Sequence, residues 1–126
     1  MASAQHLIED AEVLPLALSR PPCMWRAAAI DALTTVGRKY RVLYQSANAT
    51  ATAAAVLAGL AVSVLAESAL RPGMRVLGEA DGFPRLPMCQ IGLLRSWNRP
   101  ASPIVDALAE HIVSSLDNRS VPAVAA

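Results

Sequence analysis

The stretch covering residues 40–68 constrains the fold most, because it predicts a complete strand–helix–strand unit. It begins with strand formers over residues 40–44 and continues through a polar turn into an alanine-rich helix over residues 50–58. Gly59 ends that helix, and the aliphatic run over residues 61–65 is typical of a second strand. Because two parallel strands need a crossover connection, the helix should cover one face of a sheet that contains both.

A polar turn lies between the first strand and the helix, at Ser46, Ala47, Asn48 and Thr50. Open α/β sheets bind ligands at the carboxyl ends of their strands. The free backbone N–H groups at a helix amino terminus attract carboxylates and other anions. Both features meet at this turn, so we expect any small-molecule site of the chain there. The alternative is a purely structural role, in which Asn48 caps the helix and Ser46 satisfies the turn.

A membrane-spanning helix is an alternative for the same stretch, because no charged residue occurs between Arg41 and Glu67. A span needs about 20 predominantly apolar residues. Polar residues and Gly59 interrupt this run, and neither an aromatic belt nor clustered positive charges flank it. Acidic residues also occupy the place where a signal peptide would need an apolar segment. We therefore predict a cytoplasmic protein without a membrane segment.

The 126-residue chain suits one small domain, and its composition excludes several classes of function. Its net charge of +1 and its scattered arginines provide no basic stripe for nucleic acid. The two histidines stand alone, and no HExxH, CxxC, GxSxG, GxGxxG or P-loop pattern occurs. We therefore predict no catalytic residues, no metal site and no cofactor. The two cysteines, Cys23 and Cys89, are expected to be reduced thiols.

The sequence before residue 40 predicts a strand and a helix that extend this unit. Residues 1–11 look like an irregular lead-in, and a strand is expected over residues 12–19, with Pro15 marking an edge position or a bulge. An apolar stripe that begins at Met24 predicts a helix that ends at Gly37. The order strand, helix, strand, helix, strand indicates an α/β fold with a mainly parallel sheet flanked by helices.

The sequence after residue 68 predicts shorter elements and one further helix. In chain order these are a short strand over 74–77, a connecting loop over 78–87, a strand over 88–95 and a disordered tail over 118–126. Between the strand over 88–95 and the tail, Ser102 and Pro103 mark the start of a helix. Apolar residues recur every four positions along it as far as Leu116, which predicts an amphipathic helix.

Taken together, these segments resemble the effector-binding domain of LysR-type transcriptional regulators. The segments that carry the resemblance are LPLALSRPPCMWR, GRKYRVLYQSANATATAAAVLAGLAVSVLAESAL, RPGMRVL, LPMCQIGLLRS and SPIVDALAEHI. The resemblance covers residues 12–116 and implies a lobe of a type 2 periplasmic-binding-protein-like domain. Residues 12–77 would correspond to lobe two, and residues 78–117 to a crossover, a strand and a helix that return to an incomplete lobe one.

The resemblance also implies a function, namely a ligand-sensing regulatory domain that performs no chemistry. A small-molecule effector, with a carboxylate as one candidate, would contact Ser46, Ala47, Asn48 and Thr50. This chain carries no helix-turn-helix, so we expect no direct DNA contact by it, although a full-length parent would bind DNA. Apolar faces that lobe one normally covers should favour homo-oligomers. The alternatives are a module that serves only oligomerisation and a small α/β enzyme.

Overall fold

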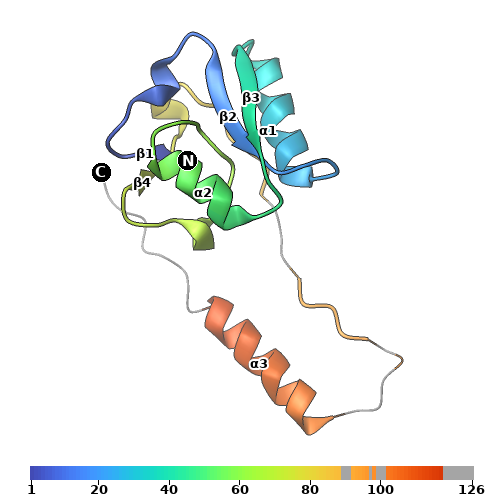
Figure 1. Ribbon diagram of the computed structural model, residues 1–126. Helices are drawn as coiled ribbons and strands as arrows, with labels where there is room; N and C mark the ends of the chain where they lie inside the picture. The colour runs from blue at the N-terminus through green and yellow to red at the C-terminus, as the bar shows by residue number, and fades with distance from the viewer. Residues whose placement is uncertain (89–91, 97, 99–101, 118–126) are drawn as a thin grey trace. The chain divides into compact units, whose positions relative to one another are not determined.

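The computed structural model describes residues 1–88, 92–96, 98 and 102–117, and the chain divides into two compact units (Figure 1). The first unit is Met1–Pro87, and it contains strands β1 to β4 together with helices α1 and α2. The second unit begins at Met88 and contains helix α3.

A parallel pair of strands forms the centre of the first unit (Figure 1). β2, Leu14–Leu18, pairs along one edge with β3, Tyr40–Gln45. The register changes once, because Leu16 lies opposite Val42 whereas Ala17 lies opposite Tyr44. Leu43 is therefore an extra residue in β3, which makes a β-bulge beside the middle of β2.

The other edge of β2 pairs with the segment around Val62 through a single parallel bridge. Val62 N–H donates to the Pro15 carbonyl at 2.8 Å, and Ala17 N–H donates to the Val62 carbonyl at 2.9 Å. The strand expected over residues 61–65 is thus reduced to this bridge, although its parallel direction is confirmed. Of the two alternatives expected for Pro15, the edge position is wrong, because β2 also bonds to the Val62 segment, whereas a bulge does occur close by, between Leu16 and Ala17. Pro15 is tolerated there because the bond to Val62 uses its carbonyl rather than an N–H.

One helix follows each of the paired strands. α1, Met24–Thr35, follows β2, and α2, Ala49–Leu57, follows β3, which confirms both predicted helices. Each ends before a glycine in the left-handed region, with φ of 67° at Gly37 and 68° at Gly59. A Cβ at position 59 would also lie 2.4 Å from the His6 ring, so this turn requires glycine for space as well as for conformation.

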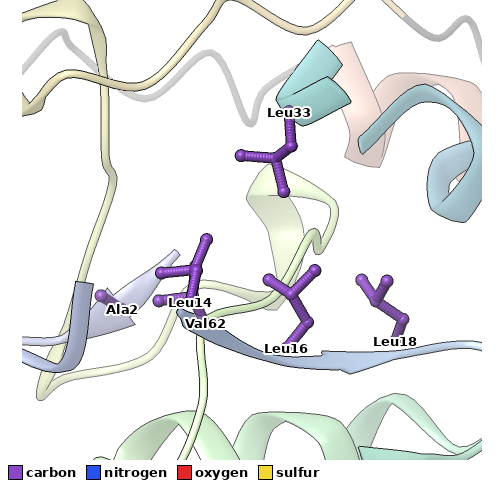
Figure 2. Close-up of a cluster of buried hydrophobic side chains, with 6 residues drawn as sticks. All are labelled: Ala2, Leu14, Leu16, Leu18, Leu33 and Val62. Carbon is purple, nitrogen blue, oxygen red and sulfur yellow. The ribbon is translucent and has the colours of Figure 1, made fainter. Parts of the chain in front are cut away.

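The main core of the first unit lies between β2 and α1. Leu14, Leu16 and Leu18 alternate along β2 and project to one face, where Leu33 of α1 approaches them (Figure 2). The green helix α2 runs on the opposite side of β2 in the same view (Figure 2). α2 buries a second cluster with β4, formed by Ala53, Val56 and Met74. The parallel strands therefore lie between helices, as the sequence predicts, although the sheet is smaller than expected.

The first eleven residues belong to the fold, so the expectation of an irregular lead-in is wrong. β1, Ala2–Ser3, pairs antiparallel with β4, Met74–Arg75, and a 3-10 turn follows at Ile8–Asp10. Both residues of β1 are buried. The Glu9 side chain is buried too and forms an ion pair with Arg75. The strand expected over residues 74–77 exists, but it is shortened to two residues.

The remaining segments are mostly irregular except for the last helix. The loop expected over residues 78–87 contains one 3-10 turn, Glu79–Asp81. α3, Pro103–Asp117, begins at the predicted proline, and Asp106 N–H donates to the Ser102 carbonyl at 3.0 Å. The strand expected over residues 88–95 is wrong for residues 92–95, which form no strand. Its residues 89–91, with Cys89, and the tail over 118–126 lie outside the described residues.

Candidate functional site

The carboxyl ends of β2 and β3 lie side by side, as parallel pairing requires. Ser46 N–H donates to the Leu18 carbonyl at 3.1 Å, which joins the polar turn after β3 to the end of β2. Both helices start from these ends, because Cys23 is the N-cap of α1 and Asn48 is the N-cap of α2. We call this region the carboxyl edge, and it consists of residues 19–26 and 46–51. It combines two strand ends with two helix amino termini, which favour negative charge.

Two side chains hold the start of α2. The Ser46 hydroxyl oxygen accepts from Asn48 N–H at 3.1 Å, and Asn48 Oδ1 accepts from Thr50 N–H at 2.8 Å. The structural roles expected for Ser46 and Asn48 are thus confirmed. Thr52 N–H then donates to the Asn48 carbonyl at 3.2 Å, which is the first bond of the helical ladder. These two side-chain bonds therefore occupy the N–H groups of residues 48 and 50 but not those of the residues on either side of them.

Every second backbone N–H group along this turn is free to donate a hydrogen bond to a ligand. Among the described residues, none accepts a hydrogen bond from the N–H groups of Ala47, Ala49 or Ala51. Ala47 and Ala49 are exposed, as are Asn48 and Thr50, whereas Ser46 is half-buried. The hydroxyl hydrogens of Ser46 and Thr50 likewise have no acceptor within the described part of the chain. The turn therefore offers several exposed donors to a single small anion.

An arginine and a thiol from α1 also belong to the carboxyl edge, although we predicted neither as part of the site. Arg26 Nη1 donates to the Ser19 carbonyl at 2.9 Å, and Ser19 directly follows the strand end that binds Ser46. The nearest sequence signal was the spacing, since Arg26 lies in the first turn of a helix that begins after Cys23. A guanidinium at this place adds a charge-assisted donor to the helix termini.

The Cys23 thiol differs from an ordinary cysteine in its acidity. As a neutral thiol it makes no capping hydrogen bond. The backbone N–H of Arg26 nevertheless stabilises the thiolate, and the Ser19 hydroxyl and the Trp25 N–H add to this effect. The pKa of Cys23 is therefore lower than usual, although partial burial acts in the opposite direction. An anion at the start of α1 is thus stabilised by the same kind of donors that the start of α2 exposes.

The carboxyl edge is rich in donors, which suits the binding of an anion. The described residues contain no group of three or more His, Cys, Asp or Glu side chains that could hold a metal ion. In the same part of the chain, no helix has the length and apolar character needed to cross a bilayer.

Comparison with known proteins agrees with this architecture. The sequence profile of the LysR substrate binding domain matches residues 1–117. The chain belongs to the LysR substrate-binding domain family. This confirms the resemblance drawn from the sequence. The family match also includes the first eleven residues, consistent with the pairing of β1 with β4.

Two curated relatives of this LysR-family domain are transcriptional regulators. This chain is 35% identical over 94 residues to the HTH-type transcriptional regulator PecT of Dickeya dadantii (strain 3937), and the matched region covers 75% of this chain and 30% of PecT. This chain is also 38% identical over 99 residues to the HTH-type transcriptional regulator DgdR of Burkholderia cepacia, and here the matched region covers 79% of this chain and 33% of DgdR. The chain thus spans about a third of the length of these relatives.

Proposed function

We propose that this domain senses a small-molecule effector, a carboxylate or a similar anion, at the carboxyl edge, as part of a transcriptional regulator. The observation that carries the proposal is the set of exposed donors left after Ser46 and Asn48 have capped α2. In this arrangement the N–H groups of Ala47, Ala49 and Ala51 receive the anion. The hydroxyl groups of Ser46 and Thr50 donate beside them, and Asn48 fixes the geometry of the turn.

The affinity of this edge alone is low, because a single exposed helix terminus contributes only about 0.3–1 kcal/mol. Arg26 increases the attraction when its guanidinium donates to the ligand while it stays anchored on the Ser19 carbonyl. We therefore expect millimolar binding by this chain, and tighter binding where a second lobe closes over the ligand and excludes water. In this proposal the domain performs no chemistry, acts in the cytoplasm and makes no direct contact with DNA.

Self-association is the second part of the proposal, and the exposed apolar residues of α3 support it. Ile104 is 80% exposed and Leu108 is 56% exposed, and Val105 and Val113 beside them are exposed too. These residues recur at helical spacing, so they form one apolar stripe rather than scattered positions. An exposed stripe of this kind favours burial against a second copy of the helix, as in homo-oligomers.

The effector site can be tested by removing one free donor without disturbing the helix. Ala49 is the first residue of α2, a position that favours proline, and Asn48 before it already has the extended backbone that proline requires. Ala49→Pro therefore deletes one N–H group and keeps the helix start. Ala49→Ser is the matched control, because it retains that N–H group. Both variants are titrated with benzoate and followed by amide NMR.

The proposal expects benzoate to shift the amide resonances of residues 46–51 in the parent chain and in Ala49→Ser. Ala49→Pro should weaken binding about tenfold, as the loss of one charge-assisted hydrogen bond predicts. Arg26→Gln should also weaken benzoate binding, but the amide resonances that shift should still be those of residues 46–51. Benzoate shifts that avoid residues 46–51, or equal binding by the proline and serine variants, would contradict the site.

A further inference from the structure

A cavity of about 330 Å³ that opens to solvent lies in the first unit, on the face of β2 that packs against α1. Leu14, Leu16 and Leu18 form its floor, Leu33 lies on the α1 side, and residues 76–79 and 83–86 contribute the remaining wall. Its volume falls at the lower end of the range of small-molecule sites, about 300–1,000 Å³. Residues 46–51 do not line it, so it is separate from the effector site proposed above.

The walls of this cavity are mainly aliphatic. Figure 2 shows Leu16 and Leu18 rising from β2 on the side from which Leu33 descends. All three side chains are at least 95% buried, so the floor of the cavity is deep in the protein. Ala29 and Ala32 line the cavity on the α1 side, and their short side chains leave space that a longer residue would fill. A chain with only 4% aromatic residues thus builds a core with room inside it.

The polar side chains in the lining already have partners within the protein. The Ser63 hydroxyl donates to the Ala17 carbonyl at 2.6 Å. Arg85 Nε donates to the Glu79 carboxylate at 3.0 Å, and this ion pair lies at the exposed rim. The amino group of Met1 is also in the lining, where it donates to the Ser63 carbonyl at 2.6 Å. Burial, with the nearby charge of Arg75, lowers its pKa to about 6, so it is mostly uncharged at pH 7.5. At that pH a charged guest would therefore lose its hydration without gaining a full counter-charge in the interior. The mainly apolar lining therefore favours an uncharged, apolar guest.

We propose that this cavity is a second ligand site, which takes an uncharged, mainly apolar small molecule of the size of a substituted benzene ring. The guest packs against the leucines of β2 and against Phe83 in the outer wall. Its chemistry is opposite to that of the carboxyl edge, which takes an anion through backbone donors. One domain thereby distinguishes two classes of molecule through two independent sites.

A matched pair of probes tests this proposal, because benzyl alcohol and benzoate have nearly the same shape and differ in charge. The full chain is labelled at its Leu and Val methyl groups and titrated with each probe. Benzyl alcohol should shift the methyl resonances of Leu14, Leu16, Leu18 and Leu33, with a dissociation constant in the millimolar range expected for a ligand of this size. Nuclear Overhauser contacts should join its ring protons to these methyl groups. Benzoate should leave the same resonances unchanged.

Two substitutions in the same helix provide the control. Ala32→Leu extends a lining side chain into the cavity and should weaken binding of benzyl alcohol about tenfold or more. Ala27→Leu makes the same change on the exposed side of α1 and should leave binding unchanged. Thermal unfolding measures whether each variant folds. If one variant fails to fold, the contacts between benzyl alcohol and the parent chain still test the site.

Four outcomes would overturn the second site. The first is an absence of methyl shifts with benzyl alcohol, and the second is contacts from benzyl alcohol to residues 46–51 instead. The third is an equal loss of binding in Ala32→Leu and Ala27→Leu. The fourth is contacts, in the chain without any probe, from the methyl groups of residues 92–96 to the cavity leucines. Such contacts would show that the chain fills the space with its own residues.

Discussion

Helices α2 and α3 are both rich in apolar residues, but they lie in opposite environments. α2 has little amphipathic pattern, and it buries Ala53 and Val56. α3 has a regular apolar stripe, and it leaves Ile104 and Leu108 more than half exposed. The regular pattern of α3 predicts that a helix forms, but the pattern carries no information on what covers its apolar face. Burial of α2 depends on its short connections to β3 and to the Val62 segment, which hold it against the sheet.

The largest expected effect is on the free energy of unfolding, and it separates the two helices. Val56→Ala removes apolar atoms from a fully buried position and should lower that free energy by about 2 kcal/mol, from lost burial plus the cavity that remains. Leu108→Ala removes more atoms but should change it by less than about 0.5 kcal/mol, as for exposed sites. Urea denaturation of both variants, at a concentration where the chain is monomeric, measures the difference, and equal losses would show that the stripe of α3 is buried within a single chain.

The next effect concerns association rather than folding. Leu108→Glu places a charge in the middle of the apolar stripe of α3 and should raise the dimer dissociation constant about tenfold or more. Ser114→Glu adds the same charge six residues further along the helix, on another face, and should have little effect. Sedimentation velocity over a range of concentrations compares them with the parent chain. A parent chain that stays monomeric throughout would refute self-association through this stripe.

A smaller effect compares the caps of the two helices that start at the carboxyl edge. Asn48→Ala removes the side-chain bond to Thr50 N–H and should lower the free energy of unfolding by about 1 kcal/mol. Cys23→Ala removes a side chain that makes no capping bond, so its cost should be only a few tenths of a kcal/mol. Thermal unfolding at neutral pH ranks the two variants. The reverse order would mean that the thiol is the stronger cap.

The smallest expected effect is the pH dependence that arises from Cys23. Because its pKa is lower in the folded chain, its thiolate stabilises the fold. This contribution is fully present above the pKa of the unfolded chain and disappears as the pH falls through the folded pKa. In a Cys89→Ser background, alkylation by iodoacetamide should therefore reach half its maximal rate at a lower pH than in the denatured chain. Ser19→Ala should raise that midpoint, because the Ser19 hydroxyl stabilises the thiolate.

The features that the sequence predicted are those that local chemistry decides. Asn48 followed by alanines and then by Gly59 contains a cap, a helix and a stop within one short segment, and all three occur. The central position of Pro15 was missed because it depends on pairing with Val62, far away in the chain. Arg26 was missed for a related reason, since only the pairing of β2 with β3 brings its Ser19 anchor beside the polar turn.

The pairing of β1 with β4 has a consequence for the order in which the chain can mature during synthesis. Ala2 and Ser3 leave the ribosome before β2 and β3, but their partners Met74 and Arg75 are among the last residues of the first unit to be made. β2 and β3 can pair much earlier, so for most of synthesis the nascent chain carries a partly formed sheet with an unpaired first segment. Glu9 also lacks its arginine until then. The first unit therefore becomes complete only when both of its ends are available together.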